Sequence, residues 1–395
     1  MDKVKSFAKC AGIGLILGLL GGVLGWAFHA FIELATDIRV ENSFLICLLP
    51  LAGVLITAIY SRFGNNRGNL NTNRVIASAE VGRSVPLVLA PLIFAGTIIT
   101  HLFGGSVGRE GAALQLGGSL GYNIGSAFKA DEDERRVLVM SGMSAFFSAM
   151  FGTPLTAAVF SLEVIRARCV HRRGLVPCVL ASFIAYEISA ALGTHGVRFE
   201  VAPMQASLPV VGKTALLALL CALVCIVFLS ALKYTSRAMC AVFKNGYLRA
   251  FAGGAGIVIL TALAGTTDYN GAGMDVISRA MSGEAASFAF AIKIIFTAIT
   301  IASGFRGGEI VPTLFIGATF GCAAGAFLGL DPAFSAAVGF TALFAGVVKC
   351  PLAALLLAFE VFGGDGIMTY ALAVVIACAL SWRFCIYEHA ELPKD

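Results

Sequence analysis

Long apolar runs separated by short polar segments follow one another along almost the whole chain. Several runs are shorter than the roughly 20 residues that a helix needs to cross a bilayer, and many contain glycine or proline. Such broken helices persist in a membrane only where protein or a water-filled cavity satisfies the freed backbone groups. The pattern therefore predicts an all-α integral membrane protein with broken, re-entrant and tilted helices. The apolar runs cover residues 8–34, 42–60, 84–103, 136–165, 175–192, 208–232, 250–264, 286–302, 311–329, 332–348 and 367–382.

The composition agrees with a chain that is embedded in a lipid bilayer. Hydrophobic residues make up 58% of the sequence and charged residues 13%, whereas a soluble domain has about 25% charged residues. Basic residues gather between the apolar runs, as in cytoplasmic loops. They have membrane spans on either side and no aromatic platform, which argues against nucleic-acid binding. The 11 cysteines are scattered without a CxxC pair, so no metal site or cofactor is expected.

Two kinds of segment occur twice along the chain. Segments with a Pro-Leu pair begin at Pro154 and Pro351, an offset of 197, and each runs on to a Glu-Val pair. Glycine-rich motifs ahead of apolar helices align Glu110 with Glu309, an offset of 199. The further matches in that alignment are Gly105 with Gly304, Gly108 with Gly307 and Gly118 with Gly317.

Because both kinds of segment repeat in the same order and with nearly the same offset, the chain is interpreted as an internal duplication. Transporters are often built from such repeats and bind their substrate between them, near the membrane midplane. We expect one transmembrane domain over residues 1–395. Its first half covers about 8–200 and its second half about 208–390.

The two glycine-rich motifs form the candidate functional site. A helix N-terminus exposes unpaired N–H groups and a partial positive charge, and can bind an anion without a basic side chain. Glycines ahead of the helix let the ion approach the backbone, and partial charges hold it weakly enough for release. If the two helix ends face each other, an anion site forms between them. The residues expected there are Gly108, Arg109, Gly111, Glu309, Ile310 and Val311.

Glu110 is expected to be a gate at this site. Its carboxylate would compete with the anion for the same N–H groups, and its protonation would release them and couple anion movement to a proton. The simpler alternative is a helix-capping carboxylate paired with Arg109, which is itself expected to be chiefly structural. A membrane enzyme with Glu110 and Glu309 as an acid/base pair is a third alternative, although no nucleophile or metal cluster accompanies the pair.

The Gly-Arg-Glu-Gly motif at residues 108–111, together with residues 307–312, resembles the CLC family of chloride channels and anion/proton antiporters. The resemblance covers nearly the whole chain, including Ile386 and Tyr387. It implies an inverted-repeat fold and a homodimer with one pore per subunit. It also makes Glu110 the gating glutamate and places the backbone N–H groups of Glu309 and Ile310, with the Tyr387 hydroxyl, at the central anion site.

Within the family, the second motif resembles the fluoride/proton-exchanging branch, which has a glutamate at the position of Glu309. The serine loop of the chloride branch is replaced here by residues 64–71, so Asn69 or Asn71 is expected to contact the ion. Fluoride members typically have threonine at the positions of Ala112 and Val311, and this chain departs from them at both.

The resemblance favours fluoride/proton antiport for fluoride export, with Glu309 as a candidate for proton transfer. A chloride channel or a chloride/proton antiporter of the same family is the alternative. The expected partners are fluoride or chloride, protons, the lipid bilayer and a second copy of the chain. A multi-pass protein of a prokaryotic plasma (inner) membrane, without a cytosolic regulatory domain, is expected.

Overall fold

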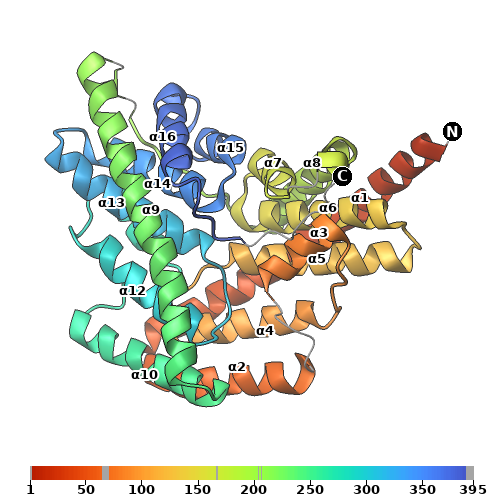
Figure 1. The fold of residues 1–395 in the computed structure, drawn as a ribbon, viewed down its shortest axis with the longest axis horizontal. Helices are drawn as coiled ribbons and strands as arrows, with labels where there is room; N and C mark the ends of the chain where they lie inside the picture. Colours follow the sequence, from red (N-terminus) through yellow and green to blue (C-terminus); the bar gives the residue numbers. More distant parts are fainter. Residues whose placement is uncertain (1, 65–70, 166–167, 203, 206, 388–395) are drawn as a thin grey trace.

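The structure, a computed structural model, describes residues 2–64, 71–165, 168–202, 204–205 and 207–387 (Figure 1). These residues form sixteen α-helices and one 3-10 helix, with no strand beyond an isolated bridge. The all-α prediction is confirmed. In chain order the elements are α1 (Asp2–Glu41), η1 (Ser43–Leu48), α2 (Leu49–Gly64), α3 (Thr72–Val81), α4 (Leu89–Leu102), α5 (Glu110–Ala127), α6 (Glu132–Phe151), α7 (Pro154–Glu163), α8 (Arg168–Ala191), α9 (Leu208–Val242), α10 (Gly246–Ala264), α11 (Met274–Met281), α12 (Ala289–Ala302), α13 (Ile310–Phe327), α14 (Pro332–Val348), α15 (Pro351–Phe362) and α16 (Ile367–Leu380).

Only some of these helices are long enough to cross a bilayer. Within the described residues, six segments have the length and the apolar composition of a span. Five further apolar helices have 10–17 residues, as the prediction of broken helices requires. Of the six spans, Ile310–Phe327 is the most buried. The six are Ala8–Glu41, Ser43–Gly64, Arg173–Ala191, Leu208–Val242, Gly246–Ala264 and Ile310–Phe327.

The predicted run over 136–165 is two helices rather than one. Gly152, with a φ of 73°, ends α6 in the left-handed conformation, and its N–H donates to the carbonyl of Ser148 at 2.8 Å. Pro154 then begins α7, where a proline costs no hydrogen bond. The short helices α3 and α11 lie outside the predicted runs because neither contains a long apolar stretch.

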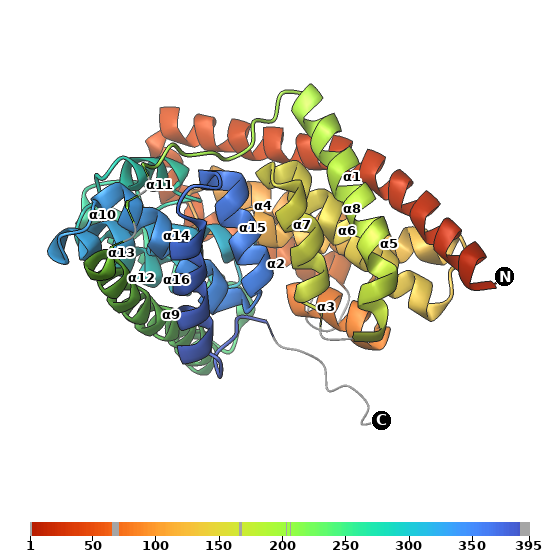
Figure 2. The same ribbon diagram turned by 90° about the horizontal axis from the view of Figure 1, so that it is seen from above.

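Equivalent helices of the two halves lie on opposite sides of the molecule. Helices α5 to α8 lie on one side and α13 to α16 on the other, and the view from above shows the same division (Figures 1 and 2). Helix α1 packs along α6 and α8, whereas α9 packs against α12, α14 and α16.

Glycines let the central helices of each half approach to backbone contact. A Cβ atom on Gly117 of α5 would lie 2.1 Å from the carbonyl oxygen of Gly142 on α6. In the second half, a Cβ atom on Gly317 of α13 would lie 2.4 Å from the carbonyl oxygen of Gly339 on α14. Small residues at such crossings are how membrane helices pack closely. These contacts fix α5 and α13, the two helices that open the candidate site.

Gly117→Ala is expected to lower the thermal unfolding midpoint of the detergent-purified protein by a few degrees. The added methyl overlaps the α6 backbone, and overpacking of this kind costs about 1–3 kcal/mol. Gly256→Ala in α10 is the matched control, because a Cβ atom there meets nothing within 4 Å. Equal midpoints for the two variants would contradict the packing described here.

The halves also cap each other's helices. Glu360 of α15 accepts hydrogen bonds from the N–H groups of Leu155 and Thr156, at 2.9 and 2.8 Å, at the start of α7. Glu163 at the end of α7 accepts equivalent bonds at the start of α15, from Leu352 at 3.1 Å and Ala353 at 2.9 Å. Contacts exchanged in this reciprocal way indicate a pseudo-two-fold axis between the halves. The offset of 197 predicted from the sequence is confirmed here.

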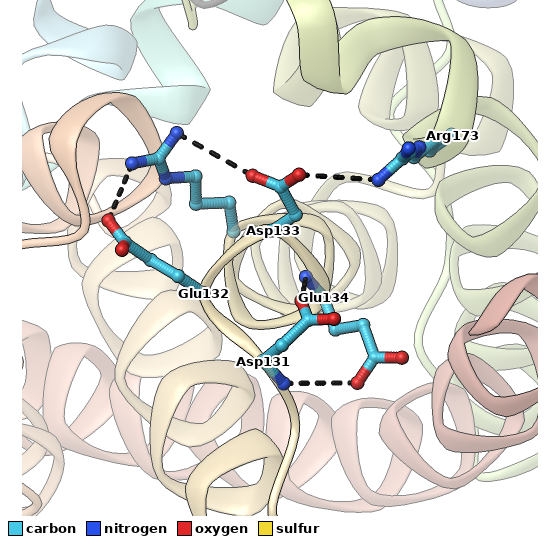
Figure 3. Close-up of polar contacts among 6 residues, drawn as sticks. Asp131, Glu132, Asp133, Glu134 and Arg173 are labelled. Atoms are coloured by element: carbon cyan, nitrogen blue, oxygen red, sulfur yellow. Dashed lines mark hydrogen bonds and ion pairs between the residues drawn. The ribbon is translucent and has the colours of Figure 1, made fainter. Parts of the chain in front are cut away.

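The acidic start of α6 is fixed by a capping box (Figure 3). Asp131 accepts from the N–H of Glu134 at 2.8 Å, and the Glu134 carboxylate accepts from the N–H of Asp131 at 3.1 Å. Asp133 pairs with Arg173 of α8 at 3.3 Å, and Lys9 of α1 pairs with Glu134 at 2.7 Å. These contacts tie α1 and α8 to the helix against which α5 packs.

Candidate functional site

The two glycine-rich loops meet directly, although they are far apart in the sequence. The N–H of Gly108 donates to the carbonyl of Gly308 at 2.7 Å, and the N–H of Gly308 donates to the carbonyl of Gly108 at 2.7 Å. This antiparallel bridge joins the loop before α5 to the loop before α13. The N-termini of the two helices are therefore side by side, which is the arrangement that the anion-site hypothesis requires.

Threonine hydroxyls brace the two loops in the same reciprocal pattern. The N–H of Ser106 donates to Thr300 Oγ1 of α12 at 3.2 Å, and the N–H of Arg306 donates to Thr100 Oγ1 of α4 at 3.2 Å. A further contact of 3.1 Å joins Ser106 Oγ to Thr297 Oγ1. Sequence reasoning missed these residues. The equal spacing of Thr100 and Thr300 from their glycine motifs was the only available signal.

The structural register of the motifs differs by one residue from the sequence alignment. Gly108 pairs with Gly308, and α5 and α13 begin at Glu110 and Ile310, so the structural offset is 200 (110 to 310). The alignment of Glu110 with Glu309 is therefore wrong. Glu309 occupies the N-cap of α13, as Arg109 does in α5, whereas Glu110 is the first residue of its helix.

The first turns of both helices present backbone N–H groups to the junction. In any α-helix, the first four N–H groups have no partner within the helix. The N–H of Ala113 is the first in α5 to reach back, to Arg109 O at 2.9 Å, and that of Thr313 is the first in α13, to Glu309 O at 3.0 Å. Pro312 has no N–H, so α13 presents those of Ile310 and Val311.

The Glu110 side chain is completely buried at this junction. Its Oε2 accepts from the N–H of Arg109 at 3.2 Å, so the carboxylate folds back over the start of its own helix. Its Oε1 lies 3.5 Å from Arg109 Nε, an ion pair without hydrogen-bond geometry. A carboxylate at a helix N-terminus is stabilised by the helix dipole, whereas burial favours its neutral form. The carboxylate therefore lies at the start of α5, beside backbone N–H groups that have no partner within the helix.

Glu309 lies across the junction from Glu110, at the start of the other helix. A Cβ atom on Gly111 would be 3.5 Å from Glu309 Oε2 and 3.6 Å from the N–H nitrogen of Glu309. The carboxylate therefore faces the first turn of α5. In contrast to Glu110, the Glu309 residue is only partly buried. Two carboxylates thus lie at one pair of helix starts.

Tyr387 is brought to the same region by a backbone anchor. The N–H of Ile386 donates to the carbonyl of Val347 at 3.1 Å, near the end of α14. The Tyr387 side chain is buried, and its hydroxyl has no hydrogen-bond partner among the described residues. The ring lies within electrostatic range of the Glu309 carboxylate. Of the residues that the sequence singled out, the structure thus places Glu309 across the junction from Glu110, and Tyr387 on the side of Glu309.

Only one of the two candidate asparagines falls within the described residues. Asn71 caps α3, where its Oδ1 accepts from the N–H of Arg74 at 3.3 Å. The next residue, Thr72, accepts from Gln115 Nε2 of α5 at 3.1 Å, so α3 begins beside α5. Asn69 lies outside the described residues.

Ala112 and Val311, which stand where the resemblance to the fluoride branch led us to expect threonine, lie among apolar surroundings in the structure. Ala112 and Val311 are completely buried. A Cβ atom on Gly108 would lie 3.0 Å from the Val311 Cβ, so the valine side chain packs against the paired loops.

Comparison with known proteins agrees with this geometry. The profile of the voltage gated chloride channel family matches residues 52–382. The chain belongs to this family. A "Chloride/fluoride channel protein" of Pseudomonas syringae pv. tomato is 32% identical over 413 residues, covering 100% of this chain and 91% of the relative. An "H(+)/Cl(-) exchange transporter ClcA" of Vibrio parahaemolyticus is 26% identical over 379 residues, covering 87% of this chain and 80% of the relative.

The fold of this CLC protein is also that of a solved relative. The crystal structure of a CLC-type fluoride/proton antiporter superposes with a TM-score of 0.91 at 29% identity, covering 96% of this chain and 97% of the other. The predicted CLC-type inverted repeat is therefore confirmed, and the chain is a multi-pass membrane protein.

Proposed function

We propose that this CLC protein exports fluoride in exchange for protons, with the anion bound where α5 and α13 begin. The observation that carries the proposal is the Gly108–Gly308 bridge, which fixes two helix N-termini together in the interior of the protein. Low local dielectric strengthens the attraction of both helix ends for a small anion. A relative and a solved neighbour named for fluoride support this choice of anion.

In this proposal the anion and the Glu110 carboxylate alternate at one place. The ion accepts hydrogen bonds from the N–H groups at the helix starts, which include those of Glu309, Ile310 and Val311 on one side. Gly108, Arg109 and Gly111 form the other side, and the Tyr387 hydroxyl adds a donor. Protonated Glu110 leaves the junction and the ion enters. When Glu110 ionises again, its carboxylate displaces the ion and blocks the route.

Glu309 is the proposed proton-transfer group. Glu309 is partly exposed, whereas Glu110 is completely buried. The Glu309 carboxylate faces the first turn of α5, the helix that begins at Glu110. Intramembrane carboxylates in transporters commonly form proton relays. A glutamate at this position therefore supports exchange with protons rather than simple leak.

The proposal extends to assembly and location. The chain is expected to form a homodimer in a prokaryotic plasma membrane, each subunit with its own anion site. Named family members transport anions, and the paired glutamates of this chain are assigned to gating and proton transfer rather than to chemistry on a bound substrate.

Halide selectivity in liposomes tests the choice of anion. Protein reconstituted into vesicles loaded with both fluoride and chloride is expected to release fluoride several times faster, as recorded by paired ion-selective electrodes. Release of chloride at an equal or higher rate would support the alternative, a chloride channel or chloride/proton antiporter, for which the chloride/proton exchanger among the relatives is the precedent.

Asn71→Asp is expected to reduce fluoride efflux more than chloride efflux. Fluoride binds its water strongly and needs short donors to replace it, and the Asn71 amide offers N–H groups while its oxygen caps α3. The aspartate keeps the capping oxygen but loses the donors. Asn71→Ser, which keeps both a cap and one donor, is the matched variant and should remain closer to wild type. An unchanged fluoride-to-chloride efflux ratio in Asn71→Asp would indicate that Asn71 does not contact the ion and would leave Asn69 as the candidate.

A further inference from the structure

The corner where α9 ends and α10 begins is a strongly basic surface that the proposed function does not use. The end of α2 reaches the same corner, where Ser61 Oγ lies 2.7 Å from Tyr247 Oη of α10 (Figure 1). We call the five cationic side chains of these segments the basic corner. They are Arg62 of α2, Lys233 and Arg237 of α9, Lys244 of the connecting loop and Arg249 of α10.

The cations of the basic corner gather around one face of α9. Lys233, Arg237 and Cys240 follow at spacings of four and three residues, which places them on the same face of the helix. The Arg249 guanidinium reaches this face from α10, and its Nη1 lies 3.2 Å from Cys240 Sγ. Helix α10 also begins here, so its first turn adds the partial positive charge of a helix N-terminus. Positive charge from two helices and a helix start is therefore concentrated in one place.

No carboxylate on the surrounding helices balances this charge. The sequence has no aspartate or glutamate over residues 42–79 and 201–267, which include all of α2, α9 and α10. The other helices that pack on α9 and α10, namely η1, α12, α13, α14 and α16, have none either. Every cation of the basic corner is exposed except Arg249, which is partly buried. Because the cations repel one another, an anionic partner would stabilise this surface.

The uncharged side chains at the corner define the chemistry of that partner. Val242, Leu248 and Phe251 are exposed on the same two helices, and so are Tyr234 and Tyr247. In a membrane protein, exposed apolar side chains on a spanning helix face the lipid tails, and tyrosines gather at the level of the headgroups. The partner must therefore offer negative charge and acyl chains together. An anionic phospholipid has both, whereas a free phosphate ion has only the charge.

We propose that the basic corner binds an anionic phospholipid of the cytoplasmic leaflet, with the headgroup phosphate against Arg237, Lys244 and Arg249 and the acyl chains along α9 and α10. Basic clusters at the cytoplasmic ends of membrane helices attract anionic lipids in this way. The cytoplasmic side follows from the positive-inside tendency. The inference does not depend on which anion the protein transports.

A lipid at this corner acts on the helices that support the loop before α13. Helices α2 and α10 pack on each other. The ring centre of Tyr60 on α2 lies 3.8 Å from the guanidinium carbon of Arg306 in that loop. A Cβ atom on Gly53 of α2 would lie 2.8 Å from the ring of Phe305, the preceding residue. A ligand that binds only the folded protein stabilises it, so the lipid should raise the thermal unfolding midpoint.

Native mass spectrometry of the detergent-purified protein tests the proposal by counting bound lipids. The protein is titrated with phosphatidylglycerol and, separately, with phosphatidylcholine of the same acyl chains. We expect wild type to retain phosphatidylglycerol preferentially. Arg237→Gln and Lys244→Gln should each weaken its binding about fivefold, since one cation contributes about that factor to the binding of anionic headgroups. Lys129→Gln is the matched control, because Lys129 is also exposed but lies beside the acidic start of α6.

Equal retention of the two lipids by wild type would overturn the proposal, and so would equal loss of phosphatidylglycerol from Lys129→Gln and the two corner variants. Thermal unfolding distinguishes the lipid from a free ion. Phosphatidylglycerol should raise the midpoint of wild type more than that of the corner variants, whereas inorganic phosphate at the same concentration should leave it unchanged. An equal rise with inorganic phosphate would contradict a lipid site and indicate an ion site instead.

Discussion

Glu110→Gln is expected to reduce proton movement in reconstituted liposomes to the leak of protein-free vesicles, while anion flux persists. Glutamine has the shape of the protonated carboxyl but cannot take up or release a proton. Wild-type flux should rise as the pH falls, because protonation frees the junction, and the variant's flux should not change with pH. The buried carboxylate over the first turn of α5 is the structural basis for this expectation.

Glu187→Gln is the matched control for the gate. Glu187 is exposed on α8, far along the chain from the paired loops, and its neutralisation should leave proton coupling intact. Retention of pH-dependent, proton-coupled flux in Glu110→Gln would remove Glu110 from the mechanism and leave the capping role as its explanation.

Glu309→Gln is expected to abolish proton coupling but to keep some fluoride binding. The carboxylate faces the first turn of α5, and Val311, which has no hydroxyl, offers no other route for a proton beside it. The backbone N–H groups at the helix starts remain, so calorimetry should still detect fluoride. Proton and fluoride fluxes recorded together on the same vesicles measure the coupling.

Tyr387→Phe separates anion binding from proton transfer at the same site. It removes one donor and no titratable carboxylate, so it should weaken fluoride binding while the ratio of fluoride to protons stays at the wild-type value. Were Glu309→Gln to keep that ratio too, Glu309 would be structural, and the fluoride-exchanger proposal would lose the residue on which it most depends.

The helix starts at Glu110 and Ile310 could be predicted because glycines precede long apolar runs. The meeting of the two motifs was the condition on which the expected anion site depended. The register between the two motifs could not be predicted from the sequence. Matching glutamate to glutamate gave an offset of 199, whereas the backbone pairs Gly108 with Gly308. Side-chain identity and backbone position are separate constraints, and here they differ by one residue.

The side-chain network around the site could not be predicted from the sequence either. A threonine within an apolar helix usually bonds to a carbonyl of its own helix, and Thr100 does so with Gly96 at 2.8 Å. Nothing in the sequence shows that the same oxygen accepts from Arg306 in the other half. The capping of α7 by Glu360 was unpredictable for the same reason, because it depends on a contact between halves.

The most direct test of the central claim is whether a fluoride gradient can drive protons uphill through the wild-type protein. Vesicles containing the protein and loaded with fluoride, with equal pH on both sides, are placed in fluoride-free medium and followed with fluoride and pH electrodes. The account predicts that fluoride leaves while protons move into the vesicles against the gradient that they build. Fluoride release without any proton movement would contradict a junction at which Glu110 and the anion alternate.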